Sequence, residues 1–316
     1  MRSSSRLVSV PAVAAVLAFT AAACERPEAE DPEAEVSAEP AAGVVEFTAL
    51  EYAFEAPAEI PSGWVRYRLN NERAEEIHEV TLGVLPEGRS HAEYVEDVLP
   101  VWAELGERVR EGELEGAEEA YGAAAELLPE WALGIEYRTA RGLVSPGRST
   151  STTAYLEPGE YVLDCWVKSP DGDIHVAVGM SRGLTVTEED SGLSAPEPDL
   201  DLTLSAGGIQ ADGDLAAGDQ SIAVHLEEDP VHDNVHLIRL EDDTDLAEVA
   251  AWLDWYEEGG LQAPAPADFL GGVHAYGAMP ADGVLHFSVE DVEPGDYAWI
   301  VEAPPEDAVW ETFTVD

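Results

Sequence analysis

Four side chains with metal-binding atoms fall in two short stretches of the sequence. Cys165, His175 and Met180 follow one another in the spacing CX9HX4M, and His78 belongs to an earlier stretch. Alternation along the preceding strand directs Cys165 to the core side, and residues 170–172 are a Pro-Asp-Gly turn signal. We therefore expect the chain to fold back after this turn, so that His175 and Met180 lie near Cys165.

This combination of donor atoms favours copper. A thiolate and two imidazoles in a plane, with a weak thioether ligand, suit that metal. His78 offers the second imidazole from an inward position on a strand expected at 76–82. A single buried Cys or Met usually serves packing, and a single inward His is usually hydrogen-bonded. The four together predict a copper site, and the same fold without metal is the alternative.

The two stretches resemble the cupredoxins, the family of plastocyanin, azurin and the type 1 domains of nitrite reductase. In that family a first His follows an Asn-containing turn, as residues 69–71 precede His78 here, and Cys, His and Met come together on a C-terminal loop. The resemblance implies one type 1 copper site, with His78, Cys165 and His175 as equatorial ligands and Met180 as the axial ligand.

One neighbouring position departs from the family pattern. Glu79 stands where plastocyanin-like proteins often have an Asn that helps to hold the Cys loop. The nine residues between Cys165 and His175 also exceed the usual spacing in small electron carriers of the family.

An internal repeat divides the chain into two halves. Each half contains, in the same order, a strand, a helix with a capping box, and a Pro-Gly turn before another strand. These segments are 76–82, 90–93 and 156–161 in the first half, and 234–240, 245–248 and 292–297 in the second.

Short alternating strands separated by Pro and Gly turns indicate β-sandwiches. We expect an all-β chain with helical insertions, built as two tandem Greek-key sandwiches that the resemblance implies to be cupredoxin-like. The expected copper domain covers 44–190 and carries a helical insertion at about 88–136. A linker at 191–199 and a second domain at 200–316 follow.

The second half lacks most of the metal-binding residues. Aligning the Pro-Gly turns places Val301 opposite Cys165, and aligning the last strands places Val309 opposite Met180. No His lies between the two Val residues, and His236 alone keeps an imidazole position. We expect a degenerate cupredoxin-like domain without copper.

The N-terminus is typical of an export signal. Residues 1–23 contain two Arg, an apolar run too short to span a membrane comfortably, and three Ala before Cys24. Small residues before a Cys resemble the lipobox of bacterial lipoproteins, which implies lipidation of Cys24 followed by an acidic Pro/Ala tether over 24–43. Ordinary cleavage near residue 23 is the alternative. We expect an exported, lipid-anchored protein on the periplasmic or extracellular face of the cell envelope.

The charge restricts the possible partners. The chain has 66 Asp and Glu against 15 Lys and Arg, a formal charge of −51. This excludes nucleic acid, and an anionic membrane would repel the chain, so the lipid is the expected membrane contact. Acidity along the whole chain favours adaptation to high salt, and an acidic face for a cationic partner is the alternative.

The residues around Cys165 bear on the reaction. Multicopper enzymes of the resembled family pair this Cys with an adjacent His that reaches a second copper, whereas Asp164 and Trp166 flank it here. The resemblance therefore implies a one-electron carrier, not an enzyme, with a redox partner protein in the envelope, no small-molecule substrate, and electron exit through His175. A non-redox module that docks another envelope protein is the alternative, and copper delivery ranks below both.

Overall fold

The computed structural model describes residues 43–316 except 115, 140–141, 228–231, 258, 276–282 and 304–306. The described residues belong to one compact unit. The expected export signal, Cys24 and the tether up to residue 42 lie outside the described residues. No described helix is both long enough and apolar enough to cross a membrane.

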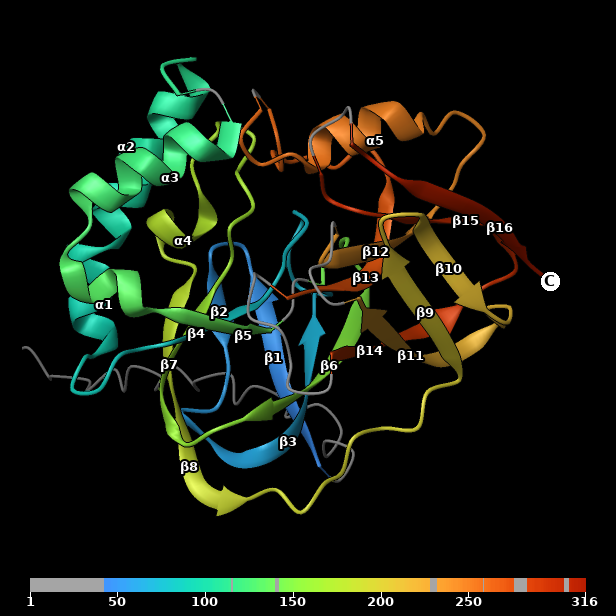
Figure 1. Ribbon diagram of the computed structural model, residues 1–316, viewed down its shortest axis with the longest axis horizontal. Helices are drawn as coiled ribbons and strands as arrows, with labels where there is room; N and C mark the ends of the chain where they lie inside the picture. Colours follow the sequence, from blue (N-terminus) through green and yellow to red (C-terminus); the bar gives the residue numbers. More distant parts are fainter. Residues whose placement is uncertain are drawn as a thin grey trace, which may run out of the picture. The chain divides into compact units, whose positions relative to one another are not determined.

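The structure is mainly β, with helices inserted between strands (Figure 1). The strands of the first repeat are β1 (Val44–Leu50), β2 (Ala53–Glu55), β3 (Glu59–Asn70), β4 (Thr81–Val84), β5 (Glu136–Thr139), β6 (Ser149–Leu156), β7 (Gly159–Asp164) and β8 (Ser181–Asp190). Those of the second repeat are β9 (Leu200–Ser205), β10 (Gly208–Asp212), β11 (Gly218–Leu226), β12 (Asn234–Arg239), β13 (Asp268–His274), β14 (Val284–Val292), β15 (Gly295–Ile300) and β16 (Trp310–Val315).

The described helices are α1 (His91–Asp97), α2 (Leu99–Arg110), α3 (Gly116–Leu127), the 3-10 helix η1 (Glu130–Gly134), α4 (His175–Val178) and α5 (Leu246–Leu253). Of these, α1 and α5 begin where the capping boxes predict them. The Ser90 hydroxyl accepts from the Glu93 N–H, and the Glu93 carboxylate accepts from the Ser90 N–H. At the start of α5, the Asp245 carboxylate accepts from the Ala247 N–H. Because these caps are local contacts, the sequence alone revealed them.

Strand β3 connects the two sheets of the first sandwich. Its beginning runs parallel to β8, with Glu59 opposite Thr185, and its later part runs antiparallel to β6 from Gly63 onward. Gly63 has a φ of 83°, so the chain passes between the sheets at a residue without a Cβ. β7 pairs with β8 and β4, and β4 pairs with β5, which completes the second sheet.

The repeated Pro-Gly turns form the same tyrosine corner twice. The Tyr161 hydroxyl donates to the backbone oxygen of Glu157 at 2.8 Å, and the Tyr297 hydroxyl donates to that of Glu293 at 2.8 Å. Both rings are buried, at 1% exposure each. Each corner fixes the start of the strand that leads toward the metal-site position of its repeat.

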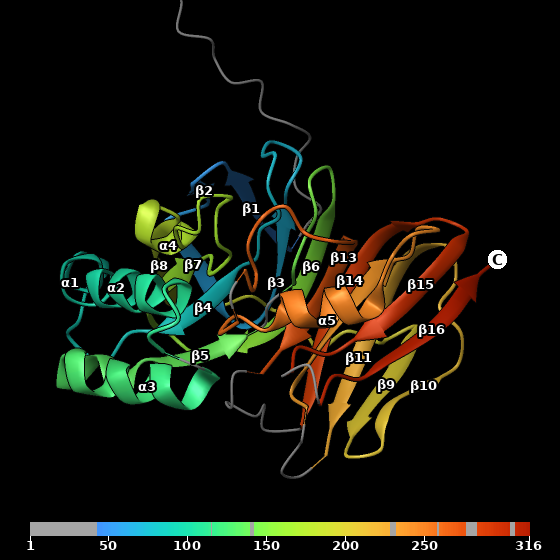
Figure 2. The same cartoon turned by 90° about the horizontal axis from the view of Figure 1, so that it is seen from above.

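The two repeats share a sheet. β6 pairs antiparallel with β14, and the joined sheet runs in the order β10-β9-β11-β14-β6-β3-β8-β7-β4-β5. Across the junction Arg66 donates to the Ser288 hydroxyl at 2.8 Å, and Arg68 binds both carboxylate oxygens of Glu290 at 2.8 and 2.5 Å. β1 and β2 join this large sheet through the pairing of β1 with β3, and a second sheet has the order β13-β12-β15-β16. Figure 2 shows β6 continuing into the strands of the second repeat.

Candidate metal centre

Three of the four expected ligand side chains meet inside the first repeat. Cys165 Sγ lies 3.7 Å from His78 Nδ1 and 3.6 Å from His175 Nδ1, and the two Nδ1 atoms are 3.2 Å apart. All three residues are fully buried. Among the described residues they form the one group of His, Cys, Asp or Glu side chains whose donor atoms could hold a metal together.

The spacing of these atoms fits a metal ion. A point equidistant from three atoms at these separations lies about 2.0 Å from each, which is the length of a metal–nitrogen bond. The buried Nε2 of His78 has no hydrogen-bond partner among the described residues. Burial of Nε2 without a hydrogen bond costs free energy, and a metal bond at Nδ1 of the same His78 ring would offset that cost. The residues therefore fit a copper ion.

His78 is held just before β4, not within a strand. Its N–H donates to the Val144 oxygen at 3.1 Å and its oxygen accepts from the Val144 N–H at 2.8 Å. The Asn71 side chain donates to the backbone oxygens of Glu76 and Val144, both at 2.8 Å. The prediction of a strand over 76–82 was therefore wrong at its start. The backbone there is held by an isolated bridge between His78 and Val144 and by the Asn71 side chain, not by a neighbouring strand.

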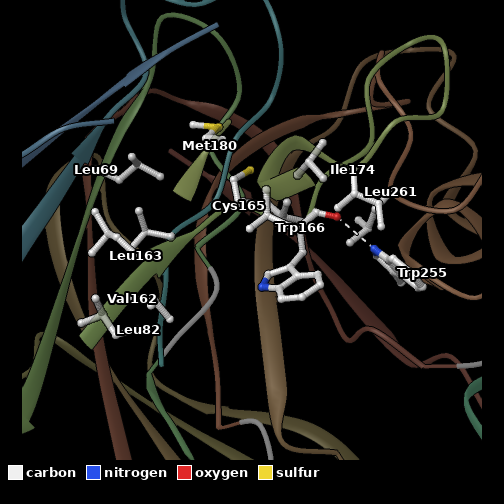
Figure 3. Packing of buried hydrophobic residues seen from close by; sticks show 14 of the residues in the cluster. Leu69, Leu82, Val162, Leu163, Cys165, Trp166, Ile174, Met180, Trp255 and Leu261 are labelled. Atoms are coloured by element: carbon white, nitrogen blue, oxygen red, sulfur yellow. Dashed lines mark hydrogen bonds between the residues drawn. The ribbon is translucent and has the colours of Figure 1, made fainter. Parts of the chain in front are cut away.

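Backbone hydrogen bonds close the chain from Cys165 to Met180 onto itself. The Val176 N–H donates to the Cys165 oxygen at 2.8 Å, the Met180 N–H to the His175 oxygen at 2.8 Å, and the Cys165 N–H to the Met180 oxygen at 3.2 Å. Met180 is fully buried, and Figure 3 shows it beside Cys165. The fourth expected ligand is thus tied to Cys165 and His175 through the backbone.

Burial keeps both imidazoles neutral. It lowers the pKa of His78 to about 3, with a smaller contribution from a charge on His175, and it lowers the pKa of His175 to about 4. A neutral imidazole keeps a lone pair for a metal, so both rings are ready to bind one at neutral pH.

A carboxylate fixes the orientation of His175. Glu76 Oε2 lies 2.9 Å from His175 Nε2, and the Tyr52 hydroxyl donates to Glu76 Oε1 at 3.1 Å. When Nε2 donates its hydrogen to the carboxylate, the lone pair is left on Nδ1, the atom that faces Cys165. The Glu76–His175 contact is therefore the support that a metal-binding imidazole needs.

Glu79 connects the two stretches of chain that carry the cluster. It is fully buried, and its Oε1 accepts the backbone N–H of Trp166 at 3.0 Å. This bond ties the residue after His78 to the residue after Cys165. The Glu79 side chain therefore helps to hold the loop that begins at Cys165.

Replacing Glu79 with Ala is expected to weaken copper retention about tenfold, because outer contacts of this kind affect metal affinity by about 10-fold to 100-fold. Competition with a copper chelator measures the change. Glu79→Gln is the control, since its amide oxygen still accepts the Trp166 N–H, and it should retain copper within about threefold of the wild type. Equal losses in both variants would contradict the role of the hydrogen bond.

Trp166 lies on the opposite side of the chain from the cluster. In Figure 3 the Cys165 sulfur and the Trp166 indole point away from each other. The indole packs against Trp102 of α2, with ring centroids 5.3 Å apart at 82°. The helical insertion therefore covers the outer side of the Cys165 strand.

The second repeat retains the backbone geometry without the ligands. The Val301 N–H donates to the Val309 oxygen at 3.1 Å, which is the bond that Cys165 makes to Met180 in the first repeat. His236 is fully buried and packs edge-on against Phe269 at 5.9 Å. The described part of this repeat has no metal-binding cluster of His, Cys, Asp and Glu.

The sequence did not reveal the role of Glu76. It lies two residues before His78 in a run of acidic residues, so nothing in its spacing distinguishes it from a solvated carboxylate. Only the fold brings it to His175, which is 99 residues away along the chain.

Solved structures resemble this chain, whereas no family model and no curated protein matches it. Reduced auracyanin from the photosynthetic bacterium Roseiflexus castenholzii is similar in structure, with 19% identity, a TM-score of 0.27, and coverage of 46% of this chain and 98% of the auracyanin. Auracyanin B has 22% identity, a TM-score of 0.27, and coverage of 48% and 92%. A copper nitrite reductase from Nitrosomonas europaea has 10% identity, a TM-score of 0.22, and coverage of 86% and 93%.

The structure is all-β with helical insertions, as the sequence predicted. The buried cluster of His78, Cys165 and His175 is consistent with a type 1 copper site.

Proposed function

We propose that the protein is an exported one-electron carrier that holds a single copper ion through His78, Cys165 and His175, with Met180 as a weak axial ligand. The observation that supports this most directly is the buried triangle of one sulfur and two nitrogen atoms with sides of 3.2 to 3.7 Å. Bound copper supplies the one-electron couple between Cu(II) and Cu(I).

The protein part of this function is rigidity. The loop bonds among Cys165, His175 and Met180, the Asn71 contacts and the Glu79 contact fix the ligands before a metal arrives. A frame held by so many buried hydrogen bonds resists rearrangement, so both oxidation states would meet nearly the same geometry. Little rearrangement favours fast electron transfer.

Electron exit through His175 is proposed to pass by way of Glu76. The His175 ring is fully buried, so a partner does not reach it directly. Glu76 lines a cavity of about 460 Å³ together with Glu51, Glu75 and Asp268. Pro and Ala side chains form most of the rest of its lining, and a redox partner with a basic docking surface would complement the four carboxylates.

Copper oxidases and nitrite reductases are among the similar solved structures, and both are enzymes. We propose a carrier for this chain because Asp164 and Trp166 flank Cys165, where a second copper centre would need a His. Turnover of nitrite, or of oxygen with an electron donor, by copper-loaded protein would contradict this part of the proposal.

A copper titration tests the proposed function. Apoprotein receives Cu(II) while the visible spectrum is recorded, and voltammetry follows. We expect an intense absorption band that saturates at one copper per chain and a reversible one-electron wave. Folded protein without the band or the wave would exclude the carrier, and the non-redox docking module would become the better explanation.

Replacing Glu76 with Gln is expected to raise the reduction potential by about 50 mV. The negative carboxylate against His175 favours the more positive Cu(II) state, and 59 mV corresponds to about 1.4 kcal/mol for one electron. Voltammetry at fixed ionic strength measures the shift. Glu75→Gln, which changes charge in the same cavity without contacting His175 in the described contacts, is the control and should shift the potential less. Equal shifts of the reduction potential in the two variants would show that the charge of the cavity, and not the Glu76–His175 contact, sets the potential.

Anchoring through a lipid on Cys24 is also proposed, from the Ala run before this residue. Mass spectrometry of the protein purified from membranes in detergent tests it. An acylated N-terminal Cys24 supports the anchor, whereas an unmodified N-terminus near residue 24 would show ordinary cleavage.

A further inference from the structure

An aromatic cavity lies on the side of the chain to which the Trp166 indole points, away from the Cys165 sulfur. It has a volume of about 570 Å³, which is within the range of small-molecule sites. Its aromatic walls come from Trp102 of α2, Tyr121 of α3, Tyr137 of β5, Trp166, and the pair Trp255 and Tyr256 that follows α5. The helical insertion of the first repeat and the helical segment of the second repeat thus form it together.

Five rings follow one another around this cavity. Centroid distances are 5.3 Å from Trp166 to Trp102, 6.3 Å from Trp102 to Tyr121, 5.8 Å from Tyr121 to Tyr256 and 5.1 Å from Tyr256 to Trp255. The circuit closes where Trp255 Nε1 donates to the Trp166 oxygen at 2.9 Å, as Figure 3 shows. Neighbouring rings in this series are edge-on or tilted to one another, at 55° to 86°.

The polar lining of the same cavity is acidic. Asp233 and Glu302 contribute carboxylates, and His274 Nε2 lies 3.2 Å from Asp233 Oδ1. Neither Arg nor Lys is among the described lining residues. Lys168 Nζ lies 4.3 Å from the centroid of the Trp255 ring, so this wall already stabilises a cation of the chain itself.

We propose that this cavity binds a small organic cation with a substituted ammonium group. Aromatic rings attract a cation through their negative faces, and cages of such rings are the usual recognition site for quaternary ammonium groups. The two carboxylates add charge complementarity, and the apolar walls match the alkyl groups on the nitrogen. The inference does not depend on the copper function.

Paired ligands test the proposal on the whole protein. Choline and benzyltrimethylammonium are titrated by calorimetry and by Trp fluorescence at about 0.15 M salt, beside the neutral analogues 3,3-dimethyl-1-butanol and neopentylbenzene. We expect saturable binding of at least one ammonium compound, at least tenfold tighter than its neutral analogue. Equal binding of the neutral analogues, or no binding of either ammonium compound at millimolar concentration, would overturn the proposal.

Matched variants locate the site. Tyr121 lines the cavity and is 56% exposed, whereas Tyr155 is 59% exposed and lies on β6 outside the described lining. We expect Tyr121→Leu to weaken ammonium binding about threefold or more and Tyr155→Leu to leave it unchanged. Equal effects of the two variants would overturn the assignment to this cavity.

The acidic residues have a matched pair as well. Asp233 contacts His274 inside the cavity, and Asp201 contacts His225 elsewhere, so each is an Asp paired with a His. Asp233→Asn should weaken ammonium binding about fivefold and leave the neutral analogues unaffected. Asp201→Asn should change neither. If Asp233→Asn left ammonium binding intact, the proposed attraction between the cavity carboxylates and the ammonium group would be wrong.

Discussion

Replacing Cys165 with Ser is expected to abolish the intense visible band of the copper-loaded protein. The band requires charge transfer from the thiolate to copper, and a hydroxyl is a much poorer ligand for this metal. Cys165 is the free cysteine of the described structure and lies between His78 and His175. The voltammetric wave of the wild type should be lost together with the band.

The fold is expected to survive this change. The Ser hydroxyl takes the place of a fully buried sulfur, but two imidazole nitrogens lie 3.6 and 3.7 Å from that sulfur and can accept a hydrogen bond. We expect a loss of about 1 to 2 kcal/mol in stability, measured by denaturant unfolding of the metal-free proteins.

Met180→Leu is the matched control for Cys165→Ser. It also changes a fully buried sulfur-containing residue of the same loop, but it leaves the thiolate in place. We expect it to retain an intense band, with a changed reduction potential. A Cys165→Ser protein that is folded and still intensely coloured with copper would show that another thiolate-independent site binds the metal.

Replacing Asp164 with Asn is expected to raise the stability of the metal-free protein at neutral pH. Asp164 is fully buried at the end of β7, where its Oδ2 accepts the Tyr94 hydroxyl at 2.6 Å. Burial raises the pKa of Asp164 to about 7 from 3.8, while hydrogen bonds from Tyr94 and Ser181 oppose the rise. An Asn can accept the same hydrogen bond from Tyr94 without a buried charge.

The sign of the pH dependence follows from this raised pKa. The folded protein binds a proton at Asp164 more tightly than the unfolded chain, so the stabilisation is fully present below about pH 4 and is lost as the pH rises toward 7. Three units of pKa correspond to about 4 kcal/mol at most. The lowered pKa values of His78 and His175 act in the opposite direction, since they reduce stability as the pH falls below 6.5.

Unfolding free energies between pH 4 and 8 measure the effect of Asp164. Both proteins contain the two imidazoles, so the difference between wild type and Asp164→Asn isolates the carboxyl group. We expect this difference to favour the variant increasingly with pH, up to about 4 kcal/mol. Asp242→Asn, at an exposed position, should give a difference that does not change with pH beyond about 0.5 kcal/mol. If the difference in unfolding free energy between wild type and Asp164→Asn did not change with pH, the raised pKa of Asp164 would be contradicted.

Local patterns in the sequence predicted much of the architecture. The Ser90 and Asp245 caps, the paired Pro-Gly turns and the alternating strands depend on residues a few positions apart. The expected insertion at about 88–136 contains α1, α2, α3 and η1 for the same reason. The strand over 76–82 was misjudged because alternation does not show whether a neighbouring strand exists to receive its hydrogen bonds.

The residue types and order of the candidate metal site were also readable from the sequence. A thiol, two imidazoles and a thioether are a rare combination, and the Pro-Asp-Gly turn between Cys165 and His175 already indicated a loop that folds back. The alignment of Val301 with Cys165 and of Val309 with Met180 is matched by the same backbone hydrogen bond in both repeats.

Only the tertiary structure decided which distant residues support these groups. Glu76 reaches His175, Glu79 reaches Trp166, and β6 joins β14. Aromatic rings from α2, α3, β5, the loop after β7 and the segment after α5 line one cavity. Such contacts depend on the path of the whole backbone, and an acidic or aromatic residue carries no local mark of its distant partner. The sequence by itself therefore determined the chemistry of the metal-binding residues and the local elements, whereas long-range packing determined their support and the aromatic cavity beside them.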